Sequence, residues 1–164
     1  MSYIQYVNPL MGTDSVHEFS NGNTLPLAAF PFGANHYSPD TRGGTSFYFN
    51  SRDYRTKGIR LTHTMSPWLG DYNYLTMNAV IDDGRILRVS ADKEPESTYN
   101  RDKAVFTPAS INMHLNFFNT DIMLSPTPHG GIFRAIWNFE NKTNFFTLSP
   151  GPGKAEYKID YENG

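Results

Sequence analysis

The stretch Ser110-Ile111-Asn112-Met113-His114-Leu115-Asn116-Phe117 decides the fold class. Apolar side chains alternate strictly with polar ones along it, and a period of two is that of a β-strand with one buried face. A second alternation runs over residues 132–139, where Ile132 and Ile136 make the other face apolar as well. A strand that is apolar on both faces is expected to be covered on both sides.

Outward from these two strands, the chain consists of short apolar segments between turn residues. Further strands are predicted at residues 3–7, 45–48, 59–63, 75–81 and 85–89, and residues 82–84 form the hairpin turn before the last of them. Residues 25–32 contain Pro26 and Pro31, which favours an edge or an irregular buried segment. Residues 39–44 are predicted as a turn. Residues 157–164 resemble a strand without a closing element, so we expect the chain to be a piece of a longer protein.

The composition supports an all-β fold. The 164 residues include 12 Phe, 10 Tyr and 2 Trp, together with 13 Gly and 11 Pro, which suits strands and turns better than helices. One domain is expected at this length. The sequence therefore predicts an antiparallel β-sandwich.

Charge and cysteine content exclude several classes of function. The formal net charge is −2, which removes the basic face that nucleic-acid binding needs. No apolar stretch approaches the length of a membrane span, so no membrane partner is expected. The chain has no cysteine, which excludes disulfides and thiolate sites. No signal peptide is recognised, so a cytoplasmic location is expected, or a secreted one if a signal was trimmed.

Familiar catalytic and metal motifs are missing from the sequence. The five histidines, at positions 17, 36, 63, 114 and 129, lack the spacing that places two imidazoles on one metal ion. Nearby carboxylate pairs such as Asp14 with Glu18 lie in polar turns, where solvated side chains are the simpler interpretation. The glycosylation pattern Asn141-Lys142-Thr143 is read as a chance match.

Two segments nevertheless concentrate residue types that sugar sites use. Residues 61–72 place an imidazole, a hydroxyl, an indole and a carboxylate on one strand end and its loop: His63, Ser66, Trp68 and Asp71. Such a group suits a polyol pocket. In the alternative interpretation, Asp71 only holds the loop and Trp68 closes the edge of the core. The second segment offers Gly12, Thr13, Asp14 and His17 as further candidate contacts.

The same segments carry a family resemblance. Residues 7–13 (VNPLMGT) resemble the opening of glycoside hydrolase family 92, the calcium-dependent exo-acting α-mannosidases. Residues 24–33, then 38–41, then 58–72 are similar to that family's next blocks, in the same order. Residues 90–137 fit more loosely. In residues 66–69, Ser-Pro-Trp-Leu stands where the family commonly has a small, Gly-rich loop.

The resemblance implies a two-domain enzyme. Residues 1–164 would be its partial N-terminal domain, a β-sandwich of the galactose-mutarotase-like (supersandwich) type, and the catalytic (α/α) barrel would be absent from this chain. The general acid, the general base and the Ca²⁺ ligands would lie in that barrel. An inverting mechanism would place the two carboxylates roughly 6.5–9.5 Å apart, across a water.

The expected function follows from this resemblance. The full-length protein would hydrolyse terminal α-mannosyl linkages of N-glycans or mannans with inversion. Its partners would be an α-mannoside oligosaccharide and the chain's own C-terminal catalytic domain, which the sandwich would support while lining the sugar site. The fragment alone is expected to be inactive. The alternatives are a free-standing carbohydrate-binding module and a purely structural sandwich.

Overall fold

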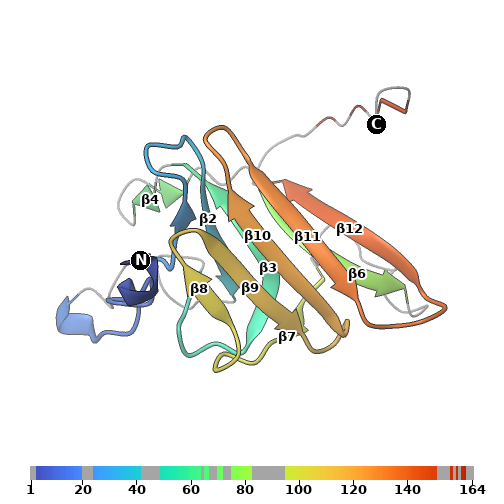
Figure 1. The fold of residues 1–164 in the computed structure, drawn as a ribbon. Helices are drawn as coiled ribbons and strands as arrows, with labels where there is room; N and C mark the ends of the chain where they lie inside the picture. The colour runs from blue at the N-terminus through green and yellow to red at the C-terminus, as the bar shows by residue number, and fades with distance from the viewer. Residues whose placement is uncertain are drawn as a thin grey trace.

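The described part of the chain is built almost wholly from antiparallel strands (Figure 1). The computed structural model describes residues 3–19, 24–41, 49–63, 65–66, 70–71, 75–82, 95–150, 156, 158 and 160–161. Two 3₁₀ helices, η1 (Tyr3–Tyr6) and η2 (His17–Phe19), precede the strands. No helix among these residues has the length and apolarity that a membrane crossing requires. The predicted all-β, antiparallel fold class is confirmed.

The strands form two main sheets. The large sheet has the order β1-β2-β3-β6-β12, and β7 also pairs with β3. Its strands are β1 (Ala28–Ala29), β2 (His36–Thr41), β3 (Arg55–Thr62), β6 (Leu75–Asp82), β7 (Ser97–Thr98) and β12 (Thr143–Pro150). The small sheet has the order β11-β10-β9-β8. Its strands are β8 (Val105–Thr107), β9 (Ser110–Leu115), β10 (Thr120–Pro126) and β11 (Gly131–Trp137).

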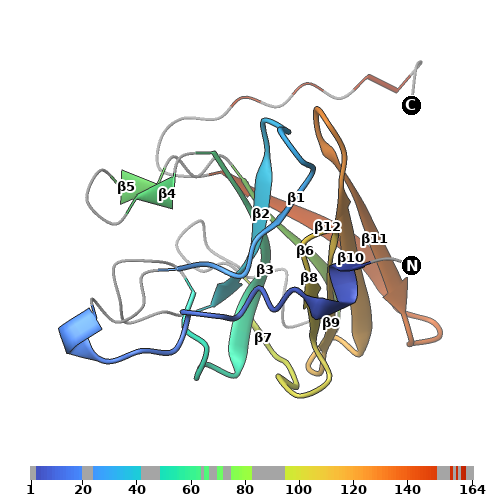
Figure 2. The same cartoon turned by 60° about the vertical axis from the view of Figure 1, so that its left-hand side comes forward.

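The two sheets face each other across the larger of two apolar clusters among the described residues (Figure 2). Ile111, Met113 and Leu115 of β9 are buried against Ile59 of β3 and Ala79 of β6, as the alternation in residues 110–115 predicts. Trp137 closes this core toward β12, where its ring meets Phe146 edge-on and its indole N–H donates to the carbonyl of Val80. The sandwich is thus held by apolar burial between the sheets, the dominant favourable term in folding.

A separate two-stranded ribbon follows β3 directly. It consists of β4 (Met65–Ser66) and β5 (Gly70–Asp71), which pair only with each other among the described strands. In Figure 2 the ribbon lies outside the two sheets, on the side of the molecule away from β11.

Several predicted elements are confirmed. Residues 59–62 belong to β3, residues 75–81 to β6 and residues 110–115 to β9. Residues 28–29 form β1, an edge strand, within an otherwise irregular segment that buries Leu25 and Pro26. The strands predicted at 45–48 and 85–89, and most of the turn at 82–84, lie outside the described residues.

Other predictions were wrong, each for a physical reason. Residues 3–6 form a 3₁₀ helix, because nothing described pairs with them to make a strand. Residues 39–41 belong to β2, since β1 pairs only with Tyr37 and His36 and leaves Pro39 on an open edge that needs no N–H donor. The outer face of β11 is not covered: it lies at the end of the small sheet, and Ile132 is 66% exposed.

The end of the strand predicted at residues 110–117 and the strand predicted at residues 157–164 also differ from expectation. Phe117 lies beyond the end of β9 and is exposed, while its neighbour Phe118 is buried and meets it edge-on. In the C-terminal segment, the described residues Lys158, Asp160 and Tyr161 are not in a strand.

Candidate functional site

The strongest polar cluster around a predicted site residue lies where β3 ends. His63 follows the last residue of β3, and its Nε2 lies 2.5 Å from Oδ1 of Asn35. The amide nitrogen of Asn35 donates to the backbone carbonyl of His129, at 3.1 Å. Because a carbonyl only accepts, this bond fixes which end of the amide faces His63, and Nε2 of His63 must carry a proton.

His36 adds a second imidazole beside this pair. It begins β2 and is paired in register with Thr62, the residue before His63. Burial lowers the pKa of His36 below its usual value, and the nearby His63 lowers it further. His36 is therefore neutral at pH 7. The amide of Asn35 and the imidazoles of His36 and His63 suit hydrogen bonding to hydroxyl groups.

The ribbon β4–β5 places two more predicted residues next to His63. Ser66 and Asp71 lie on its two strands, where Met65 pairs with Asp71 and Ser66 with Gly70. Trp68, in the loop between these strands, lies outside the described residues. The chain path thus brings Ser66 and Asp71 into one hairpin that continues from His63.

The second predicted group forms a turn in the N-terminal segment. Thr13 closes it, because both its backbone N–H and its hydroxyl donate to the carbonyl of Leu10. Gly12 has φ 81°, a left-handed conformation that glycine adopts without strain. Asp14 forms an exposed ion pair with Arg52 at 2.9 Å, and His17 begins η2. The contacts described for this turn run to Leu10 and Arg52, whereas the imidazole of His63 meets Asn35.

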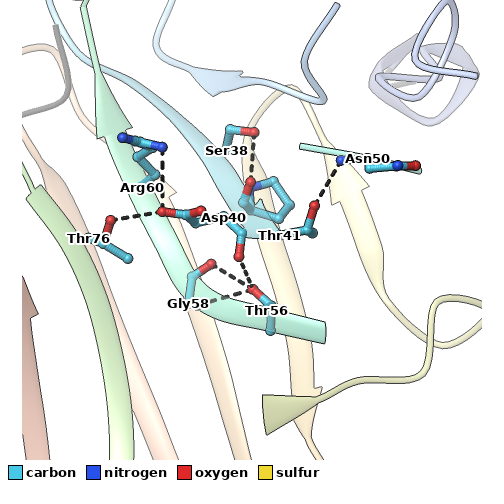
Figure 3. Close-up of polar contacts among 9 residues, drawn as sticks. Ser38, Asp40, Thr41, Asn50, Thr56, Gly58, Arg60 and Thr76 are labelled. Atoms are coloured by element: carbon cyan, nitrogen blue, oxygen red, sulfur yellow. Dashed lines mark hydrogen bonds and ion pairs between the residues drawn. The ribbon is translucent and has the colours of Figure 1, made fainter. Parts of the chain in front are cut away.

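A buried polar network on β2, β3 and β6 was not predicted from the sequence (Figure 3). Asp40 of β2 is only 5% exposed; its Oδ2 accepts from the Thr76 hydroxyl at 3.0 Å and pairs with Nη1 of Arg60 at 3.6 Å. The Thr56 hydroxyl donates to the backbone carbonyl of Asp40 at 2.8 Å. These contacts tie β2, β3 and β6 together on the face of the large sheet that points away from the core.

That outer face is polar, yet it is buried. Ser38, Thr62, Thr76 and Asn78 are each at most 3% exposed. The side chain of Asn78 donates to the carbonyl of Pro95, which shows that chain preceding β7 lies over it. The signal in the sequence was the alternation of polar residues along β2 and β6, but burial of a polar face cannot be read from alternation alone.

No metal site is found in the described part of the chain. No three His, Asp or Glu side chains there come together in a way that could hold a metal ion.

Comparisons with known proteins agree with this architecture. The model of the glycosyl hydrolase family 92 N-terminal domain matches residues 6–157. Comparison with curated protein sequences found no match. Among solved structures, the family GH92 inverting mannosidase BT2199 from Bacteroides thetaiotaomicron superposes with a TM-score of 0.73 at 28% identity, over 90% of this chain.

Two further structures share the fold. The family GH92 α-mannosidase BT3965 from the same bacterium has a TM-score of 0.67 at 22% identity over 82% of this chain, and was also solved with mannoimidazole. The family 92 glycosyl hydrolase ccman5 has a TM-score of 0.66 at 13% identity over 90% of this chain.

The match covers only a small part of each relative. This chain spans 20% of BT2199, 18% of BT3965 and 20% of ccman5. The family model, by contrast, covers nearly the whole of this chain, from residue 6 to residue 157. The chain therefore belongs to glycosyl hydrolase family 92 and corresponds to the family's N-terminal domain.

Proposed function

We propose that this chain is the N-terminal domain of an exo-α-mannosidase that cleaves terminal α-mannosyl linkages of N-glycans or mannans with inversion. The observation that carries the proposal is the likeness to the inverting mannosidase BT2199, at 28% identity over 90% of the chain. Because the chain spans a fifth of that relative, the acid, the base and any calcium ligands are assigned to a further domain. The chain by itself is proposed to be inactive.

The first role of the domain is support, and exposed apolar side chains favour it. Tyr3, Tyr6, Met11 and Phe19 of the N-terminal segment are all more than 70% exposed. Phe32 is fully exposed and has φ 61°, an uncommon conformation for an aromatic residue. Apolar surface of this extent is typical of a face that another part of the protein covers, and the proposed cover is the catalytic domain.

The second role is to line the sugar site. Asn35, His36 and His63 present amide and imidazole groups beside the hairpin that carries Ser66 and Asp71. Amide and imidazole groups supply the donors and acceptors that sugar hydroxyls pair with. We assign Trp68, which lies between β4 and β5 in the sequence, the role of stacking on a mannose ring, and Asp71 that of accepting hydroxyl hydrogen bonds. The turn at residues 12–14 and His17 are assigned to the outer rim.

The experiment is proton NMR of the reaction of the full-length protein with methyl α-1,2-mannobioside. We expect release of mannose, and the first-formed product should be the β-anomer, because inversion turns an α-linkage into a β-hemiacetal. A first-formed α-anomer would contradict inversion. Absence of any mannose release from this and from aryl α-mannosides would contradict the proposed activity.

A further inference from the structure

A groove of about 640 Å³ crosses the outer face of the small sheet, which Figure 1 shows turned toward the viewer. Its polar lining comes from β9, β10 and the turn before β8: Asn100, Lys103, Asn112, His114 and Asp121. Ile136 of β11 and Met123 of β10 supply apolar lining. Asp121 and His114 lie at the opposite end of the β9–β10 pair from the Thr127–Gly130 turn beside Asn35. The groove is therefore a feature separate from the cluster around His63.

A chain of hydrogen bonds holds the centre of the groove in place. Nδ1 of His114 lies 2.7 Å from Oδ1 of Asp121, and the side-chain amide of Asn138 donates to Oδ2 of the same carboxylate at 3.1 Å. Burial alone would raise the pKa of Asp121, but the bonds from Asn138 and His114 outweigh it and lower that pKa. The ionised carboxylate therefore accepts from Nδ1 of His114, which fixes the ring and leaves Nε2 for a ligand.

Two further polar side chains of the groove carry no fold-supporting bond within the described structure. Among the described residues, no hydrogen bond or ion pair engages the carboxamide of Asn112 or the ammonium of Lys103. Asn112 lies on the outer face of β9, paired in register with Met123 and Val105. A carboxamide both donates and accepts, whereas an ammonium only donates. Together with Nε2 of His114, they offer a mixed set of donors and acceptors above an apolar floor.

The charges in the groove favour a neutral ligand. The positive charge of Lys103 is offset by the negative charge of Asp121, and three carboxamides (Asn100, Asn112 and Asn116) make up most of the remaining polar lining. An anion would be repelled by the carboxylate of Asp121. An apolar ligand would remove water from the carboxamides without replacing its hydrogen bonds, which costs free energy. A pyranose matches both the polar and the apolar lining of the groove, since its hydroxyls pair with amides and its C–H groups cover Met123 and Ile136.

We propose that this groove is a second carbohydrate-binding site, which takes a neutral pyranoside of one or two units through Asn112, Lys103 and His114. Its volume lies within the usual range of small-ligand pockets, roughly 300–1,000 Å³. The inference goes beyond the proposed function, because binding here needs neither hydrolysis nor the cluster around His63. Its role is to hold a polysaccharide on the protein while another part of the molecule acts on it.

The test is affinity electrophoresis of the full-length protein in native gels that contain a soluble, neutral α-mannan. We compare the wild type with the double variant Asn112→Ala/Lys103→Ala, which removes two groups without breaking a bond that supports the fold. The dissociation constant from the gel series should rise about fivefold or more, because each lost hydrogen bond weakens binding severalfold. Hydrolysis of 4-nitrophenyl α-mannoside, measured on the same samples, reports the proposed function separately and should not change.

The matched control is Arg134→Ala. Arg134 is exposed on the outer side of β11 but does not line the groove, and its removal changes the net charge as the loss of Lys103 does. The mannan in the gel should retard the Arg134→Ala variant as strongly as the wild type. Wild-type protein that is not retarded by the mannan, or a double variant retarded as strongly as the control, would overturn the proposal. So would inorganic phosphate that binds the wild type and displaces the mannan, because the groove would then be an anion site.

Discussion

At the scale of single residues, the side-chain amide of Asn35 connects two distant segments of the chain. Its two ends join His63, at the end of β3, to the carbonyl of His129, in the turn between β10 and β11. Those segments belong to different sheets, so one side chain holds the two sheets together at this end. It also fixes the orientation of the imidazole from which the β4–β5 hairpin starts.

Replacing Asn35 by Ala should therefore affect both stability and substrate binding. Two hydrogen bonds disappear, and the free energy of unfolding should fall by about 1–3 kcal/mol in urea denaturation. In the full-length protein the KM for α-mannobiose should rise, because the hairpin with Ser66 and Asp71 loses its support. The control is His129→Ala, which keeps the accepting carbonyl and should leave both quantities unchanged. A stability equal to the wild type in Asn35→Ala would remove the bridging role.

At the scale of elements, β3 shows why the strands can be predicted and the network around them cannot. Gly58 interrupts its alternation with φ 123°, where the pairing with β2 shifts between Asp40 and Thr41. A Cβ added at Gly58 would lie 2.1 Å from the carbonyl oxygen of Met77. This bulge lets the Thr56 hydroxyl reach both the carbonyl of Asp40 and the backbone N–H of Gly58 (Figure 3).

Replacing Gly58 by Ala should destabilise the sandwich strongly. The clash is with backbone and not with a movable side chain, and the φ angle is strained for any L-residue, so a loss of about 3 kcal/mol or more is expected. Gly130→Ala is the matched control, since its Cβ would meet only the hydroxyl of Thr127, at 3.7 Å. Urea denaturation of both variants checks this, and equal midpoints would contradict the role of the bulge.

The sequence predicted the elements where local alternation and burial coincide. Residues 110–115 alternate in the sequence and in the structure, because β9 has a core on one side and an open face on the other. In β2, local pattern gave a wrong prediction, because Pro39 and Asp40 resemble turn residues. They can be recognised as strand residues only once the open edge of β2 and the partners of Asp40, Arg60 and Thr76, are known. The strands β10 and β12 were also not predicted from the sequence.

The candidate site could be predicted only in part. His63, Ser66, Trp68 and Asp71 are predicted together because they lie within a few residues of one another. The described ones, His63, Ser66 and Asp71, do lie on one strand end and its hairpin. Asn35 and His36 come from a distant part of the chain. Pairing of β2 with β3 brings them beside His63, and no pattern within residues 24–41 signals that pairing.

At the scale of the whole molecule, the chain has one face that a solitary domain would not explain. The N-terminal segment is apolar and yet exposed, whereas the polar outer face of the large sheet is already covered by the chain itself. The exposed side chains of Tyr6, Met11 and Phe32 are typical of a surface that another part of a protein covers permanently. Since the chain spans a fifth of the relative BT2199, we propose that this neighbour is the rest of the same protein.

The most direct test of this account compares the full-length protein with the isolated 164-residue chain in hydrolysis of 4-nitrophenyl α-mannoside. We expect that the full-length protein releases nitrophenol, and that the isolated chain releases none above the uncatalysed rate. Turnover by the isolated chain, or none by the full-length protein, would contradict it.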